Sequence, residues 1–196
     1  YSDIFYLRHL LTNFLFLISI VYFSKLIFEI SNNAFLSIWG SLMLYSSPRL
    51  FAHSFYNSKD VIFLAFFIIS IYYSLKFFNL KSKKYLILSC LSLSMLTAVR
   101  VIGVYFFLIF LLLLFIEILE NRKNKTGPID VIMFVILFFS FTYIFWPFLW
   151  ENPFGNFIYA ISSMSNYNWS GDVFYLGNYH HSHFLPWHYS LTWILI

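Results

Sequence analysis

Basic side chains stand at the edges of long apolar runs in this sequence. Arg49 and Lys59 precede one such run, and Arg100 interrupts another. Arg binds phosphate through a planar fork of donors, whereas Lys binds it as a point charge. If the apolar runs cross a membrane, charges at their ends are candidate functional residues, because charge at that depth is costly. The three side chains would then suit an anionic group at headgroup depth.

The composition of the chain supports a membrane location. Hydrophobic residues make up 61% of the 196 residues and charged residues only 10%, so a water-soluble monomer is excluded. The single cysteine, Cys90, excludes a disulfide framework. The net charge of +4 is scattered among apolar runs rather than gathered in a stripe, so we expect no nucleic-acid partner.

The apolar runs predict an all-α integral membrane protein, a multi-pass helical bundle of about six spans plus the start of another. The transmembrane core covers residues 1–147, and an outer loop covers residues 148–190. The spans are expected near 10–30, 34–47, 61–78, 85–99, 101–117 and 129–147, with a truncated span at 191–196.

The orientation follows from the basic loops. Lysines cluster at 76–84 and basic residues at 122–125, whereas residues 126–196 contain no Lys or Arg. Basic loops are normally cytoplasmic, so the 148–190 loop should face the outer side. Both basic loops stay inside only if the apolar stretch 85–116 turns near Arg100 and Gly103. We therefore divide that stretch into two short spans.

With this orientation, the polar residues collect on the outer side, all 6 histidines among them. Fixed cations at headgroup depth, an apolar groove and a nearby acid are what recognition of a polyprenyl-phosphate sugar requires. Aromatic residues of the outer loop are suited to stack on sugars, although an interfacial aromatic belt is an equally open interpretation. At the inner side, Lys25 and Glu29 have the i, i+4 spacing of a local ion pair.

Four short segments carry a resemblance to a known family. Residues 47–60 contain an Arg and, about ten residues later, an Asp that opens an apolar span. Together with 6–11, 97–103 and 186–189, this segment resembles the bacterial members of the dolichyl-phosphate-mannose protein mannosyltransferase and aminoarabinose transferase superfamily. The resemblance implies a GT-C fold and a membrane glycosyltransferase that moves a sugar from a polyprenyl-phosphate donor on the outer face.

The resemblance also implies roles for individual residues. Arg49, Lys59 and Arg100 are expected to contact the donor phosphate. Asp60 should pair with one of these cations and open its span. The other pocket residues are expected to be His53 and Asn57 beside Asp60, with Trp187 and His188 in a lid over sugar or acceptor.

No convincing match to the family's catalytic acid is present, so we expect the base upstream of residue 1. The chain is then an internal fragment that is inactive alone. We expect no metal or other cofactor. The expected partners are the polyprenyl-phosphate sugar, membrane lipid and an acceptor that is a protein, lipid or glycan. The expected location is the bacterial inner membrane, with a periplasmic active face.

Several alternatives remain open at this stage. If 55–60 is a loop, His53 and Asn57 could only cap helix ends. Asp60 could be an ordinary acid at a helix start. The histidines at 180–183 and His188 could bind zinc. The whole chain could instead be part of a secondary transporter, or of a non-catalytic lipid-binding subunit.

Overall fold

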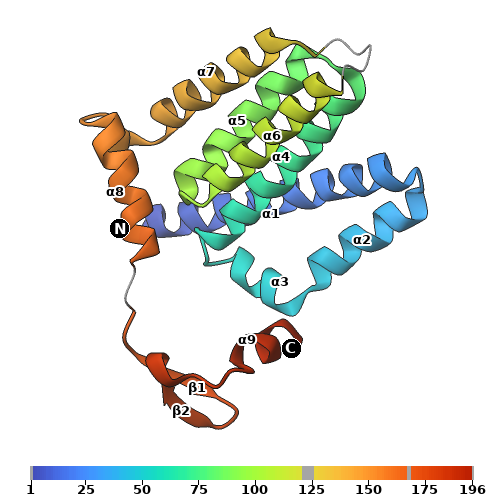
Figure 1. The fold of residues 1–196 in the computed structure, drawn as a ribbon. Coiled ribbons are helices and arrows are strands. Elements are labelled where there is room, and N and C mark those ends of the chain that lie inside the picture. The colour runs from blue at the N-terminus through green and yellow to red at the C-terminus, as the bar shows by residue number, and fades with distance from the viewer. Residues whose placement is uncertain (1, 121–125, 167–168, 196) are drawn as a thin grey trace. The chain divides into compact units, whose positions relative to one another are not determined.

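The computed structural model describes residues 2–120, 126–166 and 169–195, and it divides into two units, 1–157 and 158–196. Most of the described chain is helical (Figure 1). The first unit contains α1 (Ser2–Ser31), α2 (Ala34–Ser46), α3 (Pro48–Ser54), α4 (Asp60–Leu80), α5 (Lys83–Val99), α6 (Gly103–Leu119), α7 (Pro128–Phe145) and a single 3₁₀ turn, η1 (Pro147–Leu149). Helix α8 (Pro153–Ser165) begins in the first unit and continues into the second.

Three of these helices are long and apolar enough to cross a membrane, within α1, α4 and α7. Helices α2 and α6 are apolar but shorter. Large apolar side chains remain exposed on the outward faces, for example Leu112 at 58% and Ile132 at 58%. A helix that is apolar on both its packed and its exposed faces fits a lipid surrounding.

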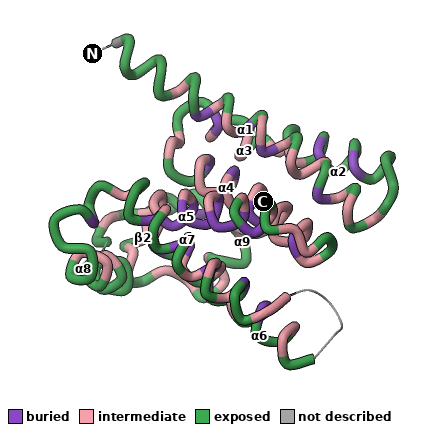
Figure 2. Tube along the Cα trace, turned by 90° about the horizontal axis from the view of Figure 1, so that it is seen from above, coloured by how far each residue is buried: buried purple, intermediate pink, exposed green. Residues whose placement is uncertain are grey.

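Helix α5 lies at the centre of the first unit and packs against α4, α6 and α7. Small polar side chains are buried along α5, and the Ser94 hydroxyl donates to the Phe138 carbonyl at 2.9 Å. Small residues let helix backbones approach closely in lipid. Stacked phenylalanines fill the adjoining core, with the Phe107 and Phe138 rings 4.1 Å apart. Figure 2 shows burial concentrated on α5 and on the faces turned toward it.

The helix directions bring distant polar segments to common ends. Hydrogen bonds join Asn13 of α1 to Ser54 at one end, and Tyr22 to Tyr73 further along. Helices α1 and α4 therefore run in the same direction, and α5 returns antiparallel to α4. One end of the bundle carries the α3–α4 junction and the α5–α6 turn; the other carries the α1–α2 and α4–α5 turns.

The break in the apolar stretch 85–116 falls where the sequence analysis divides it. Helix α5 ends at Val99 and α6 begins at Gly103. A Cβ added to Gly103 would lie 2.7 Å from the Thr97 Cα atom, so only glycine allows this close turn. The membrane crossings and their orientation stay predictions, and the basic loop at 122–125 lies outside the described residues.

One detail of the sequence analysis is wrong, and one helix is longer than the span predicted in it. Helix α1 begins at Ser2, ahead of the span predicted near 10–30, because the polar residues before the apolar run continue the helix, with Asp3 favourably placed in its first turn. Glu29 pairs with Lys76 of α4 at 2.6 Å rather than with Lys25, since it faces α4 and also accepts from Asn79. Lys25 instead lies over the Tyr22 ring.

The second unit is not an irregular loop. It contains an antiparallel hairpin, β1 (Asp172–Tyr175) and β2 (Asn178–His181), then a 3₁₀ turn η2 (Ser182–Phe184) and helix α9 (Tyr189–Leu195). Leu176 and Gly177 both have positive φ, which is the backbone of a tight two-residue hairpin turn. Tyr175 is buried, and its hydroxyl lies 2.7 Å from the Thr192 hydroxyl, which ties the hairpin to α9.

Candidate functional site

The α3–α4 junction gathers polar side chains because the sequence bends the chain there. Ser47 is extended ahead of Pro48, and Pro48 takes the first position of α3, where its missing N–H is not needed. Helix α3 ends at Ser54, and α4 begins at Asp60. The last turn of the short helix therefore carries His53 toward the start of α4.

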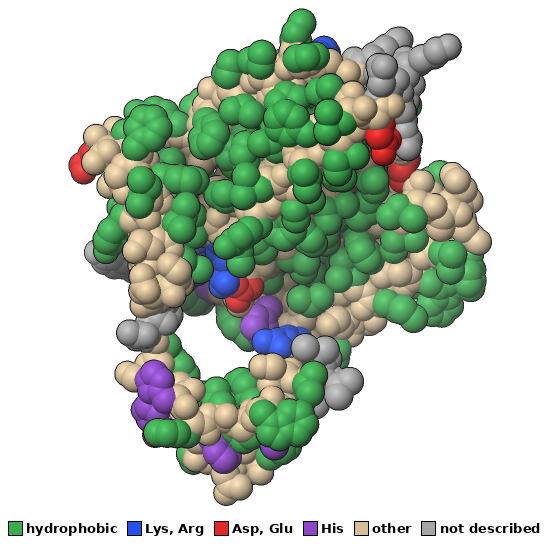
Figure 3. Space-filling model, viewed as in Figure 1, with side chains coloured by type: hydrophobic (Ala, Val, Ile, Leu, Met, Phe, Trp, Pro, Cys, Tyr) green, Lys and Arg blue, Asp and Glu red, His purple; other side chains and the backbone are tan. Residues whose placement is uncertain are grey.

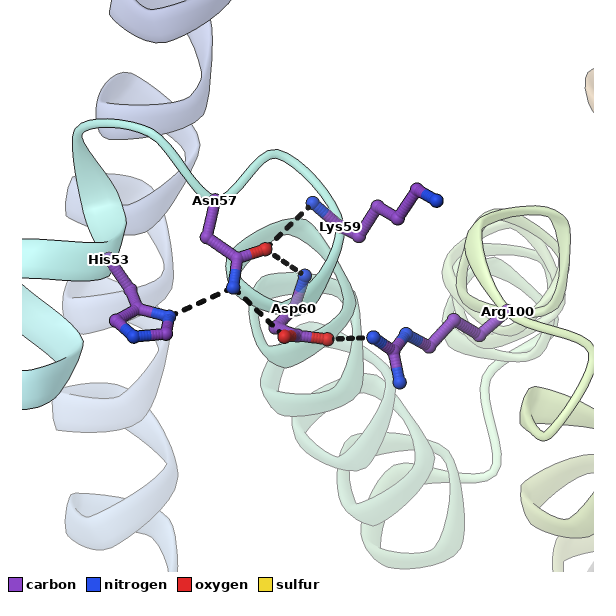
Figure 4. A network of polar contacts seen from close by, with 5 residues as sticks. All are labelled: His53, Asn57, Lys59, Asp60 and Arg100. Atoms are coloured by element: carbon purple, nitrogen blue, oxygen red, sulfur yellow. Dashed lines mark hydrogen bonds and ion pairs between the residues drawn. The ribbon is translucent and has the colours of Figure 1, made fainter. Parts of the chain in front are cut away.

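Asn57 is the centre of this junction (Figure 4). Its side-chain oxygen accepts from the backbone N–H of Asp60 at 3.0 Å and of Lys59 at 3.3 Å. Its amide nitrogen donates to Asp60 Oδ2 at 2.9 Å and to His53 Nδ1 at 2.8 Å. Asn57 thus caps the start of α4 and also holds the Asp60 carboxylate and the His53 ring in place.

Asp60 and Arg100 form an ion pair between α4 and the α5–α6 turn (Figure 4). The Asp60 side chain is 52% exposed and the Arg100 side chain 39% exposed, so the pair is open to a ligand. The Nη2 group of Arg100 donates a hydrogen bond to the Asp60 carboxylate. Because a guanidinium carries five N–H donors, others remain for an additional acceptor.

Helix α1 supports the junction from the other side. The Asn13 amide donates to Ser54 Oγ at 3.0 Å, and Ser54 is fully buried. His9 Nδ1 contacts the Phe55 carbonyl, and His9 Nε2 is buried without a hydrogen-bond partner in the described part of the chain. The sequence analysis assigned no role to His9 or Asn13 in this site.

The structure brings together His53, Asn57, Asp60 and Arg100 from the predicted set. The predicted pairing of Asp60 with a cation is confirmed, and Arg100 is its partner. Asn57 makes the contact that the capping alternative describes, and its role in a pocket stays a prediction. The spacing could have revealed this role, because a polar residue three positions before an acid is typical of a helix start.

The other predicted cations are exposed. The Lys59 side chain extends on the Arg100 side of the α4 start (Figure 4). Arg49 lies in the first turn of α3 and is exposed. Figure 3 shows basic, acidic and histidine side chains gathered on a face that is otherwise mostly hydrophobic.

Trp187 and His188 belong to the second unit, so their position relative to the junction is not defined. Their rings pack against each other edge to face at 5.5 Å, and the Trp187 residue is 85% exposed. Lid and donor-binding roles stay predictions.

The described residues contain no group of three or more metal-ligating side chains of the His, Cys, Asp or Glu type. The ring of His181 is instead occupied locally, since its Nδ1 atom accepts from the His183 backbone at 3.4 Å.

Comparison with known proteins gives one family. No curated protein and no solved structure matches the chain. The family model described as dolichyl-phosphate-mannose-protein mannosyltransferase matches residues 2–161, which include every element of the first unit. Its members are multi-pass membrane glycosyltransferases of the GT-C fold, as the sequence analysis predicts. By its sequence, its apolar helices and this match, the chain belongs to the dolichyl-phosphate-mannose-protein mannosyltransferase family.

Proposed function

We propose that this chain takes part in transferring a sugar from a polyprenyl-phosphate donor to a protein, lipid or glycan acceptor. The observation that carries the proposal is the Asp60–Arg100 ion pair beside Lys59, at one end of an apolar bundle. Family membership supports a lipid-linked sugar as donor. The transfer would take place at the end that carries the α3–α4 junction.

Arg100 is the proposed main contact of the donor phosphate. The Asp60 carboxylate accepts from Nη2 of the Arg100 guanidinium and so fixes its orientation. The remaining N–H groups of the guanidinium are then held in place for the phosphate. Lys59 adds a compact positive charge from the adjacent segment, and Arg49 adds another from α3. Arg100 and Lys59 against the Asp60 carboxylate leave a positive charge beside the ion pair, which favours an anionic headgroup.

Asn57 and His53 are proposed positioning residues in this site. Asn57 fixes Asp60 by a 2.9 Å hydrogen bond, and Asp60 in turn fixes Arg100. His53 is held by the same amide. Arg100 is therefore supported by a hydrogen-bonded chain that starts at the cap of α4, which is how a binding group keeps its geometry.

The proposed active face is the outer one, periplasmic in a bacterial inner membrane. Residues 126–196 contain no Lys or Arg, whereas lysines cluster at 76–84, at the opposite end of α4 from Asp60. The bias of basic loops toward the cytoplasm supports this orientation. Trp187 and His188 would then belong to an outer segment that covers the sugar or the acceptor.

The test is transfer from a polyprenyl-phosphate sugar in membranes that contain the protein with any further residues its gene encodes. Arg100→Ala should raise the donor Kd or KM by about tenfold or more, the effect of losing a charge-assisted hydrogen bond. Lys59→Ala and Arg49→Ala should have smaller effects of the same sign. Lys84→Ala, an exposed lysine at the other end of the bundle, is the matched control. Unchanged transfer in all three site variants would overturn the proposal.

A further inference from the structure

A polar cavity lies at the end of the bundle opposite the α3–α4 junction. It has a volume of about 360 Å³ and lies between α1, α2 and α4. Its polar lining residues are Ser24, Lys25, Glu29, Ser37, Tyr72 and Lys76. Lys76 follows Asp60 by 16 residues in α4, about 24 Å along the helix axis at 1.5 Å per residue. The cavity is therefore separate from the site at the α3–α4 junction.

The charges of this cavity do not balance. Glu29 is fully engaged, because it pairs with Lys76 at 2.6 Å and accepts from Asn79 at 3.1 Å. Lys25 has no carboxylate within ion-pair distance among the described residues, and its ammonium lies 5.1 Å from the centre of the Tyr22 ring. One cationic charge in the cavity is thus left for a ligand.

The hydroxyls of the cavity are fixed by the protein itself. Ser37 Oγ donates to the Ser24 carbonyl at 2.6 Å and lies 2.8 Å from Ser24 Oγ. This contact joins α2 to α1 beside Lys25. A preformed concave site with few polar groups is the usual form of a small-ligand site.

The rim of the cavity is apolar at Phe28, which lines the cavity and is 49% exposed. Tyr72 also lines the cavity, and tyrosine is favoured at membrane–water interfaces. A ligand in this cavity would therefore contact the Lys25 ammonium with its polar end and apolar side chains along the rest of its length.

We infer that this cavity binds the phosphate headgroup of an anionic membrane lipid, with the Lys25 ammonium as its main contact. Lysine binds phosphate as a point charge with three donors. The apolar rim favours a lipid over free phosphate, because it accommodates the start of the acyl chains. The same end of the bundle carries the lysines at 76–84, which also favours an anionic leaflet. This site does not depend on the proposed sugar transfer.

The inference is tested on the protein purified in neutral detergent, by native mass spectrometry with phosphatidylglycerol and phosphatidylcholine of identical chains. Lys25→Gln should lower the preference for phosphatidylglycerol by about tenfold. Lys25→Arg should keep it, and Lys84→Gln, which removes an exposed lysine outside the cavity, should change it less than twofold. Because Lys25 has no ion pair, the thermal unfolding midpoint of Lys25→Gln should stay close to that of the unmodified protein.

Three results would overturn the inference. Equal losses in Lys25→Gln and Lys84→Gln would mean diffuse attraction rather than a site. Displacement of the lipid by millimolar inorganic phosphate would assign the cavity to free phosphate instead of a lipid head. Unchanged preference in Lys25→Gln would exclude Lys25 as the contact.

Discussion

Asp60 and Arg100 are 40 residues apart in the sequence and form an ion pair at one end of the bundle. Asp60 is the first residue of α4, and Arg100 directly follows α5. The two helices are antiparallel neighbours, and a short turn joins their other ends. The ion pair therefore holds together the open end of this pair of helices. The same contact also orients the proposed phosphate-binding group.

These two roles of the ion pair can be separated by exchanging the charges. Asp60→Arg or Arg100→Asp alone should lower the free energy of unfolding by about 1 kcal/mol, the upper range for an exposed pair. The double exchange should recover most of that loss, because the attraction is restored. Transfer from the lipid-linked sugar should stay lost in the double variant, since the cation has moved.

Thermal unfolding in detergent and transfer in membranes measure the two effects. Recovery of both stability and transfer in the double variant would show that the pair matters only for the fold. Loss of stability in the double variant as large as in the single ones would mean that the ion pair does not hold α4 and α5 together.

Asn57 is predicted to affect both stability and transfer. Asn57→Ala removes the cap of α4 and the hydrogen bond to Asp60, so the free energy of unfolding should fall by about 1 kcal/mol. Asn33→Ala is a matched control, because Asn33 caps α2 through bonds to Phe35 and Leu36 at the other end of the bundle. It should cost a similar amount.

Transfer distinguishes the two asparagine variants. Asn57→Ala should raise the donor KM by several-fold, as Asp60 and Arg100 lose their support, whereas Asn33→Ala should leave the KM unchanged. Equal KM values in both variants would contradict the positioning role of Asn57.

Part of this site is predictable from the sequence, because it depends on residues that are adjacent in the chain. A charge and a glycine inside an apolar stretch mark the turn at Arg100 and Gly103, and an acid before an apolar run marks the start of α4. Both features are places where a helix begins or ends. A few adjacent residues determine such places, so a single sequence can predict them.

The contacts that the sequence does not reveal join distant segments. His9 with the Phe55 carbonyl, and Asn13 with Ser54, depend on how α1 crosses the α3–α4 junction. The same geometry turns Glu29 toward Lys76 instead of toward Lys25. Helix register of this kind is set by side-chain packing across the whole interface, for which a single sequence gives no direct signal. The hairpin at 172–181 was missed because its short strands lie in a segment interpreted only as a loop.

Gly103 is predicted to be intolerant of any side chain. A Cβ there would lie 2.7 Å from both the Cα and the N atoms of Thr97, and backbone atoms cannot move aside as a side chain can. Gly103→Ala should therefore cost about 1–3 kcal/mol by overpacking. Gly127→Ala is the control, because no atom of the described residues lies within 4 Å of its added Cβ. Thermal unfolding midpoints measure both, and an equal midpoint for the two variants would contradict the close turn.

Trp187 and Tyr175 should behave in opposite ways in the second unit. Tyr175 is buried and its hydroxyl lies 2.7 Å from Thr192 Oγ1, so Tyr175→Phe should cost about 1 kcal/mol locally. Faster amide hydrogen exchange in β1 and α9 would report that loss. Trp187 is 85% exposed, so Trp187→Ala should leave the exchange of this unit unchanged.

The proposed lid role predicts that Trp187→Ala nevertheless slows sugar transfer, because an exposed indole is available to stack on a sugar or acceptor. The expected effect is a several-fold rise in KM for donor or acceptor, with Trp187→Phe retaining most of the activity through its remaining aromatic face. If Trp187→Ala transfers sugar at the unmodified rate and its amide hydrogen exchange is unchanged, Trp187 takes no part in substrate binding. The proposed lid role of this residue would then be wrong.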